Sequence, residues 1–302
     1  EEAVLPQLFA RLKDLQKTIK KYRLELLFIN DGSSDDTLTM IQREAKKNSS
    51  IAYVNLSRNF GKEAGMLAGF DYAKGDAVVI IDADLQDPPE LIPQMIELWE
   101  QGYDDVYARR RSRQGETWLK KKTSEWYYRI LQKSTRIPIQ RDTGDFRLLD
   151  RRCVEALKLL RESQRNTKAL FSWIGFNKKE LLYDRDPRAA GDTKWNYSKL
   201  VNLAIDGITS FTTAPLRIAS VFGLIVSCLA FCYILYLVIR PLFGVPTGAG
   251  YSSLMAVILF MGGVQMIFLG IIGEYIGRIF NETKQRPLYL IEEYHQAHDK
   301  KQ

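Results

Sequence analysis

Two long apolar segments near the C-terminus place the strongest constraint on what this chain can fold into. Residues 216–239 carry one charge, Arg217, at their edge, and residues 251–273 have Gln265 as their one strongly polar member. As a helix, the first segment would span about 36 Å, more than the roughly 30 Å of a bilayer core. With the glycine- and proline-rich link between them, they predict a transmembrane hairpin over 216–280. Two buried helices of a soluble core are the alternative.

Basic residues flank both ends of the predicted hairpin. Three precede the first segment and three follow the second: Lys194, Lys199, Arg217, Arg278, Lys284 and Arg286. The connecting loop offers Arg240, at the membrane edge. Lysine and arginine are enriched in cytoplasmic loops. We therefore expect a multi-pass protein of the inner cell membrane, with its N-terminal domain, both termini and a tail over 281–302 on the cytoplasmic side.

The segment before the hairpin, residues 194–215, has apolar residues at helical spacing beside Trp195, Tyr197 and two lysines. This pattern favours an amphipathic helix that lies in the membrane interface. An ordinary amphipathic helix of the soluble domain is nearly as consistent with the same residues.

Residues 1–193 alternate strand and helix patterns. Short runs rich in β-branched residues lie at 24–30, 51–57 and 77–83, and helical stretches separate them. Such alternation predicts an α/β domain with a mostly parallel, Rossmann-like sheet. The chain opens on a helical pattern with no strand before it, so we expect a first strand to be missing. Ligands of such sheets bind at the carboxyl ends of the strands, where polar residues follow all three runs.

The composition excludes several kinds of site. The three cysteines are widely spaced and odd in number, which argues against a disulfide framework. Both histidines lie in the polar C-terminal segment, so a histidine-based metal site is not expected. No G-x-x-x-x-G-K-[ST] loop is present, and no G-x-G-x-x-G follows a strand, which argues against kinase-type and dinucleotide sites. The formal net charge of +7 fits an anionic partner such as nucleic acid, an acidic membrane surface or a phosphorylated substrate.

Acidic residues gather after the third strand, in "VVIIDADLQDPPE". If the strand continues through them, Asp82 and Asp84 share one face, about 7 Å apart. Two carboxylates so placed repel each other unless a cation lies near, and oxygen ligands select Mg²⁺ or Mn²⁺. The alternative is a strand cap with no metal. For Asp87, which precedes two prolines, we prefer the role of a helix cap.

Four motifs appear in one order along the chain: "FINDGSSDDT", "NFGKEAGMLAGFDYAKGDAVVIIDADLQDPPE", "DTGDFRLLDRR" and "GDTKWNYSKL". Together they resemble family 2 glycosyltransferases of the GT-A fold, and among these the polyprenyl-phosphate sugar transferases. That group includes dolichol-phosphate mannose synthases and bacterial undecaprenyl-phosphate glucosyltransferases. The motifs cover residues 1–200, and the hairpin matches by architecture. The family opens with a strand ending in Tyr-Asn-Glu-Glu, of which only "EE" is present here.

The resemblance implies a role for each matching residue. The nucleotide sugar would be bound by Glu1 and Asp31 at the nucleoside, by Asp82 at the ribose or near the metal, and by Lys62 and Lys194. Asp84 and Gln86 would ligate Mg²⁺ or Mn²⁺. Asp145 would act as a base toward the acceptor, and Arg147 would hold the acceptor phosphate. A structural ion pair between Asp145 and Arg147 is the alternative, because on an extended segment they face the same way.

The implied reaction is inverting transfer of a hexose to polyprenyl phosphate, with glucose from UDP-glucose first and mannose from GDP-mannose second. A processive polysaccharide synthase would carry a Gln-x-x-Arg-Trp motif and more spans, and a non-catalytic membrane scaffold would be expected to lose acids at the strand ends. Basic and aromatic residues interleaved over 107–136 favour docking on the bilayer over binding of nucleic acid. Gly273 and Gly277 fit a small-xxx-small contact, so a homo-oligomer is a further expectation.

Overall fold

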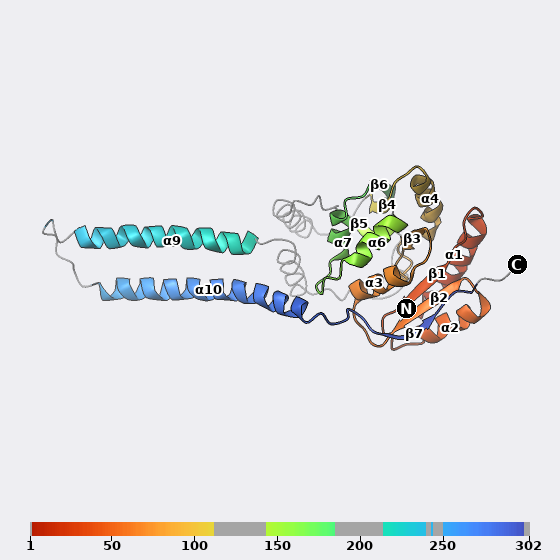
Figure 1. Ribbon diagram of the computed structural model, residues 1–302, viewed down its shortest axis with the longest axis horizontal. Coiled ribbons are helices and arrows are strands. Elements are labelled where there is room, and N and C mark those ends of the chain that lie inside the picture. The colour runs from red at the N-terminus through yellow and green to blue at the C-terminus, as the bar shows by residue number, and fades with distance from the viewer. Residues whose placement is uncertain (1, 112–142, 185–213, 240–242, 244–249, 299–302) are drawn as a thin grey trace. The chain divides into compact units, whose positions relative to one another are not determined.

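The computed structural model describes residues 2–111, 143–184, 214–239, 243 and 250–298 (Figure 1). The chain divides into two compact units. One unit comprises Glu1–Asn196 together with Arg286–Gln302, and the other comprises Tyr197–Gln285. Glu1, Lys194 and nearly all of the expected interfacial helix at 194–215 lie outside the described residues, as does most of the basic and aromatic segment.

The first unit contains a sheet of three strands in the order β1-β2-β7. Strand β1 (Leu26–Asn30) runs parallel to β2 (Ile51–Leu56), and the helix α2 (Thr37–Lys47) connects them. Strand β7 (Ile291–His295) then pairs antiparallel with β2. The segment 281–302, expected to be a tail, therefore supplies an edge strand of the N-terminal domain.

A second sheet has the strand order β3-β5-β4-β6. Its strands are β3 (Ala77–Ile80), β4 (Asp105–Arg110), β5 (Thr143–Asp150) and β6 (Lys178–Tyr183). Strand β5 is antiparallel to both of its neighbours, and β4 and β6 are parallel. The prediction of an α/β fold is confirmed, but the expected mostly parallel sheet is wrong. Strand β5 lies between β3 and β4, and strand β7 lies beside β2. Each runs antiparallel to these neighbours.

The helices begin where local chemistry favours a start. Helix α1 (Leu5–Thr18) has a proline in its first turn, where the missing N–H costs no hydrogen bond. Asp150 caps α6 (Arg151–Leu159) by accepting from the N–H of Arg152, and Asn166 caps α7 (Thr167–Trp173) by accepting from the N–H of Ala169. The remaining described helices of this unit are α3 (Lys62–Tyr72), the short 3₁₀ helix η1 (Pro89–Leu91) and α4 (Ile92–Glu100).

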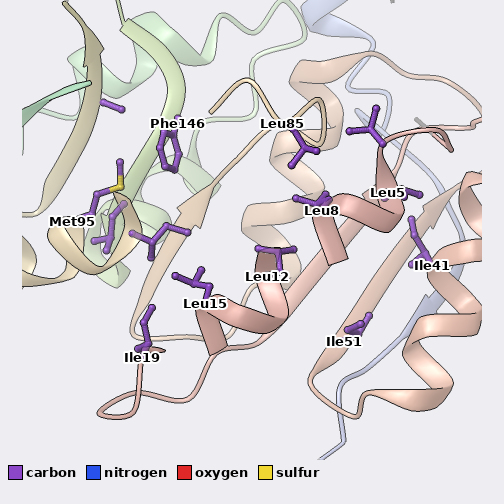
Figure 2. Close-up of a cluster of buried hydrophobic side chains, with 14 of the residues drawn as sticks. Leu5, Leu8, Leu12, Leu15, Ile19, Ile41, Ile51, Leu85, Met95 and Phe146 are labelled. Atoms are coloured by element: carbon purple, nitrogen blue, oxygen red, sulfur yellow. The ribbon is translucent and has the colours of Figure 1, made fainter. Parts of the chain in front are cut away.

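Helix α1 packs between parts of both sheets. Its buried residues recur at helical spacing: Leu5, Leu8, Leu12 and Leu15. In Figure 2 these leucines lie between Ile41 and Ile51 on one side and Met95 and Phe146 on the other, and all belong to one buried cluster. Burying each such side chain contributes about 1.5–3 kcal/mol. Helix α1 thus fixes the two sheets against each other within the unit.

The second unit contains the two helices of the hairpin, α9 (Ala214–Ile239) and α10 (Tyr251–Thr283), which run antiparallel (Figure 1). The rings of Phe222 and Phe268 meet edge to face at 6.1 Å between centroids. Among the described residues, one stretch is long and apolar enough to cross a membrane, Ser253–Thr283 in α10, while α9 offers the shorter apolar stretch Ile218–Tyr233. Helix α10 continues ten residues past the apolar segment that ends at 273 and three past the predicted end of the hairpin at 280, to about 50 Å in length.

Candidate functional site

The loops that follow β1 and β2 are joined by one carboxylate. Asp31, directly after β1, accepts a hydrogen bond at Oδ1 from the N–H of Phe60 (2.7 Å) and at Oδ2 from the N–H of Gly61 (2.8 Å). Both donors lie between β2 and α3. Asp31 therefore fixes the start of α3, in addition to the nucleoside contact expected for it.

Gly32 makes this close approach possible. Its backbone angle φ is +64°, a value that residues with a Cβ rarely adopt. A Cβ at this position would also lie 2.4 Å from the backbone nitrogen of Asn59. The "NDGSS" loop and the "RNFG" loop thus pack backbone against backbone, and only glycine fits between them.

The acidic residues after β3 lie in a turn. The strand ends at Ile80, and Leu85 is a buried residue with φ of +58°. Asp84 accepts a hydrogen bond at Oδ1 from the N–H of Gln86 (3.1 Å). The expectation that Asp82 and Asp84 share a strand face is therefore wrong, because the strand ends before either residue and Asp84 lies in a turn.

Lys62 connects the acidic turn to β5. Its Nζ lies 2.7 Å from Asp82 Oδ2 and 2.6 Å from Asp145 Oδ2. Burial alone would lower the pKa of Lys62, but the carboxylates of Asp82 and Asp145 outweigh it and hold that pKa above its usual value. Two acids expected on opposite halves of the site, one toward the donor and one toward the acceptor, thus share a single ammonium group.

Asp145 is an ionised, buried carboxylate. Its Oδ1 accepts no hydrogen bond from any residue that the structure describes. Burial would raise the pKa of Asp145, yet the cations Lys168 and Lys62 more than offset this, so that the pKa lies below its usual value. A carboxylate with a lowered pKa is a weak base, so Asp145 is better suited to holding cations and polar ligands than to removing a proton.

Arg147 has a different partner from the phosphate that we expected. Its Nη1 lies 2.9 Å from Asp105 Oδ2 and 3.2 Å from Oδ1, and its guanidinium lies over the ring of Phe171 at 3.7 Å from the centroid. The side chain is fully buried and has no surface open to solvent. Arg147 therefore forms an ion pair with Asp105 on the neighbouring strand, and not the pair with Asp145 that we considered as the alternative.

Asp87 also differs from its predicted role as a helix cap. It is buried and accepts a hydrogen bond from the hydroxyl of Tyr183 at 2.5 Å. Burial, together with this carboxylate, raises the pKa of Tyr183 to about 12. The bond connects the segment after the acidic turn to β6.

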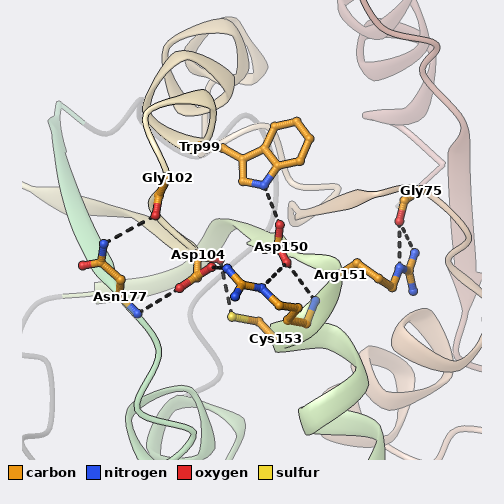
Figure 3. Close-up of polar contacts among 9 residues, drawn as sticks. Gly75, Trp99, Gly102, Asp104, Asp150, Arg151, Cys153 and Asn177 are labelled. Atoms are coloured by element: carbon orange, nitrogen blue, oxygen red, sulfur yellow. Dashed lines mark hydrogen bonds and ion pairs between the residues drawn. The ribbon is translucent and has the colours of Figure 1, made fainter.

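A polar network around Asp104 and Asp150 connects β4, β5 and α6 (Figure 3). Asp104 bonds the guanidinium of Arg152 and accepts from the N–H of Asn177 at 3.2 Å. Asp150 accepts from Trp99 Nε1 at 2.8 Å. Sequence reasoning missed these residues. Their only signal was the run of acidic and basic residues at strand ends, which is common on protein surfaces.

Comparison with known proteins accounts for this arrangement. The family described as Glycosyl transferase family 2 matches residues 1–158, which include β1 to β5 and the acidic turn. This chain belongs to glycosyl transferase family 2. It is therefore a glycosyltransferase, and the resemblance seen in its motifs is confirmed.

The hairpin of this family 2 glycosyltransferase also has a match. Residues 214–279 fit the family described as the GtrB C-terminal hairpin, so the enzyme is a membrane-associated protein. The chain is 51% identical to an uncharacterized glycosyltransferase of Synechocystis, over 96% of this chain and 91% of the relative. It is 45% identical to a prophage-derived bactoprenol glucosyl transferase of Shigella flexneri, over 98% and 96%, respectively.

The residues of the acidic turn fit a divalent cation that takes most of its ligands from a substrate. No group of three histidine, cysteine or carboxylate side chains converges on one point within the described ranges. Asp84 and Gln86 nevertheless offer oxygen ligands on one turn, and Mg²⁺ in enzymes is held by one or two carboxylates together with substrate phosphates. Asp82 is less available, because its Oδ2 binds Lys62.

Proposed function

We propose that this family 2 glycosyltransferase transfers glucose from UDP-glucose to a polyprenyl phosphate. One observation carries the proposal: relatives whose names state bactoprenol glucosyl transferase match 96–98% of the chain, hairpin included, at 44–45% identity. Bactoprenol is a polyprenol, and its phosphate is a lipid that a membrane-associated enzyme reaches within the bilayer.

The donor half of the site is formed by the strand-end loops. The locked loops around Asp31 and Gly32 set the start of α3 and with it the position of Lys62. Asp84 and Gln86 would hold Mg²⁺ or Mn²⁺, which would neutralise charge on the departing nucleoside diphosphate. Lys62, already placed between Asp82 and Asp145, adds a positive charge near the same leaving group.

The acceptor supplies its own nucleophile. An oxygen of the lipid phosphate attacks the anomeric carbon, the bond from that carbon to the diphosphate breaks, and the diphosphate leaves with the electron pair. Attack from the opposite face inverts the configuration, so an α-linked donor gives a β-linked lipid phosphate. Because a phosphate oxygen is already ionised at neutral pH, orientation matters more than deprotonation. This agrees with an Asp145 whose pKa is lowered.

The same proposal includes an orientation in the membrane. The lysine and arginine residues on either side of the hairpin support a cytoplasmic location for the catalytic domain and both termini, where nucleotide sugars are made. The pairing of β7 with β2 supports one part of this, because the segments before and after the hairpin then lie on the same side of the membrane.

Membranes that contain the enzyme, incubated with polyprenyl phosphate and radiolabelled UDP-glucose or GDP-mannose, test the proposal. Label from UDP-glucose in a lipid that mild acid hydrolyses is the expected result. If only GDP-mannose labels the lipid, the transferred sugar is mannose and not glucose. Label in a polymer would indicate a polysaccharide synthase, and label in neither lipid nor polymer would indicate a non-catalytic scaffold. Membranes with the Asp84→Asn variant serve as the control for background transfer.

A further inference from the structure

A pair of hydrogen bonds between Glu63 and Thr167, called here the Glu63 clamp, joins the two helices that carry Lys62 and Lys168. Glu63, in the first turn of α3, accepts at Oε2 from the N–H of Thr167 (2.8 Å) and also bonds the Thr167 hydroxyl. Thr167 is the first residue of α7 and is fully buried. The clamp therefore fixes the first turn of α3 against the first turn of α7. Lys62 precedes Glu63, and Lys168 follows Thr167.

Both lysines act on Asp145. Lys62 is in direct contact with it at 2.6 Å. Lys168 acts through its charge, which together with Lys62 holds the pKa of Asp145 below its usual value. Asp145 is nine-tenths buried, and its Oδ1 has no hydrogen-bond donor among the residues described, so its charge depends on the cations around it, which are these two lysines and Arg147.

The two lysines differ in what else they bind. Lys62 forms ion pairs with two acids. Lys168 is exposed, and in the described part of the chain its side chain forms no hydrogen bond or ion pair, while its charge attracts Asp145. An ammonium group of this kind, held next to the site but free to bind, suits an anionic ligand that arrives from solvent or from a lipid surface.

We propose that Lys168 binds the phosphate of the acceptor, with Asp145 and the Glu63 clamp as positioning residues. The assignment rests on the proposed function, since it requires a phosphorylated acceptor. It fills the role that Arg147 leaves open, because that guanidinium is buried against Asp105. The chemistry recognised is a phosphate monoester, whose oxygens accept hydrogen bonds from an ammonium group.

Steady-state kinetics of Lys168→Ala with UDP-glucose and polyprenyl phosphate test the assignment. We expect the KM for polyprenyl phosphate to rise by about tenfold to a hundredfold, the effect of losing a charge-assisted hydrogen bond. The KM for UDP-glucose and the rate of UDP-glucose hydrolysis by water should stay within about twofold of the wild type. Lys168→Arg should retain most of the affinity, and Lys168→Glu should lose more than Lys168→Ala.

Lys46→Ala is the matched control, because Lys46 is an exposed helical lysine on α2, which lies on the other sheet. An unchanged acceptor KM in Lys168→Ala, while the wild type transfers glucose normally, overturns the assignment and leaves the proposed function standing. A rise in the KM for UDP-glucose instead would place Lys168 on the diphosphate of the donor and also overturns it. A wild-type enzyme that shows no transfer dependent on polyprenyl phosphate removes the proposed function and this assignment together.

Discussion

Arg147 and Asp105 form an ion pair inside the second sheet, with Arg147 Nη1 2.9 Å from Asp105 Oδ2 and both side chains inaccessible to solvent. Arg147 lies opposite Tyr107 in the antiparallel register of β4 and β5, so Asp105 is its diagonal neighbour on the same face. The ring of Phe171 covers the guanidinium. The pair connects the two central strands of the sheet that carries Asp145.

Removing one partner of this pair should destabilise the domain strongly. Arg147→Met leaves the carboxylate of Asp105 buried without its main counter-ion, and we expect a loss of about 3–5 kcal/mol in the free energy of unfolding. Thermal unfolding of the purified enzyme measures this as a lower Tm. The exposed pair of Arg109 and Glu180 provides the control, since Arg109→Met should change the Tm little. A normal Tm with a raised acceptor KM would return Arg147 to the phosphate-binding role.

The Lys62–Asp145 contact should determine how the enzyme responds to acid. The pKa of Asp145 is lowered in the folded protein, so its ionised form contributes stability above its unfolded pKa of about 3.9, which is lost as the pH falls through the folded pKa. Lys62→Met removes one of the cations near Asp145, and burial then acts to raise the pKa of Asp145. We expect the Tm of the variant to lie below that of the wild type near pH 7 and the difference to shrink as the pH falls toward 3, because protonation of Asp145 costs the variant less stability. Superimposable profiles between pH 3 and 7, with Lys46→Met as the control, would contradict this.

Divalent cations should be required for turnover. Asp84→Asn replaces a charged ligand by a neutral one of the same shape, and we expect kcat to fall by at least about 100-fold with the Tm unchanged. EDTA should have a similar effect on the wild type, and added Mn²⁺ or Mg²⁺ should reverse it. Full wild-type activity in EDTA would show that no cation is needed.

Strand β7 should stabilise the first sheet. Tyr289, just before β7, donates a hydrogen bond to Asp71 at 2.5 Å, and Asp71 also binds the guanidinium of Arg161. We expect Tyr289→Phe to cost about 1 kcal/mol. A chain that ends at Gln285 should lose far more, with rapid hydrogen exchange at the β2 amides. Protected β2 amides in the truncated chain would show that β7 is dispensable.

Cysteine labelling should reveal the orientation. In a background of Cys228→Ser and Cys232→Ser, an impermeant maleimide should label Thr247→Cys on intact cells and should label Lys300→Cys only after lysis. Cys153 can stay, because burial, together with Asp105, raises the pKa of its thiol to about 12 and keeps it unreactive. The opposite labelling pattern would place the catalytic domain outside and refute the orientation.

Hydrophobic patterning carried enough information to predict the hairpin, the α/β class and the helix-strand alternation up to residue 83. It failed for β7, because "IEEYH" is short and half charged. Its glutamates are bound by the hydroxyl of Tyr53 and the amide of Asn55, contacts between residues more than 230 positions apart in the chain. No local pattern encodes such a pairing.

The site divides in the same way. Asp31 and Asp82 could be found as polar residues that follow strands, Lys62 as a cation after a glycine turn, and Asp145 through the family resemblance. The structure joins Asp82 and Asp145 through Lys62, and Asp31 binds the N–H of the neighbouring Gly61. The partner of Arg147 could not be predicted, because the register of β4 against β5 brings Asp105 next to it, and the sequence does not reveal that register. Lys168 went unnoticed because a lysine at the start of a short helix resembles any solvated residue in the sequence, and only the fold brings its charge near Asp145.

Strand β7 has a consequence for the order in which this enzyme is made. The ribosome synthesises β1 and β2 early, then both helices of the hairpin, and β7 after them. Domains fold as their residues emerge, but the first sheet lacks its edge strand until α10 has been translated. The first sheet is therefore completed only after the membrane hairpin has been synthesised, and the hairpin can meet the bilayer before β2 has its second neighbour.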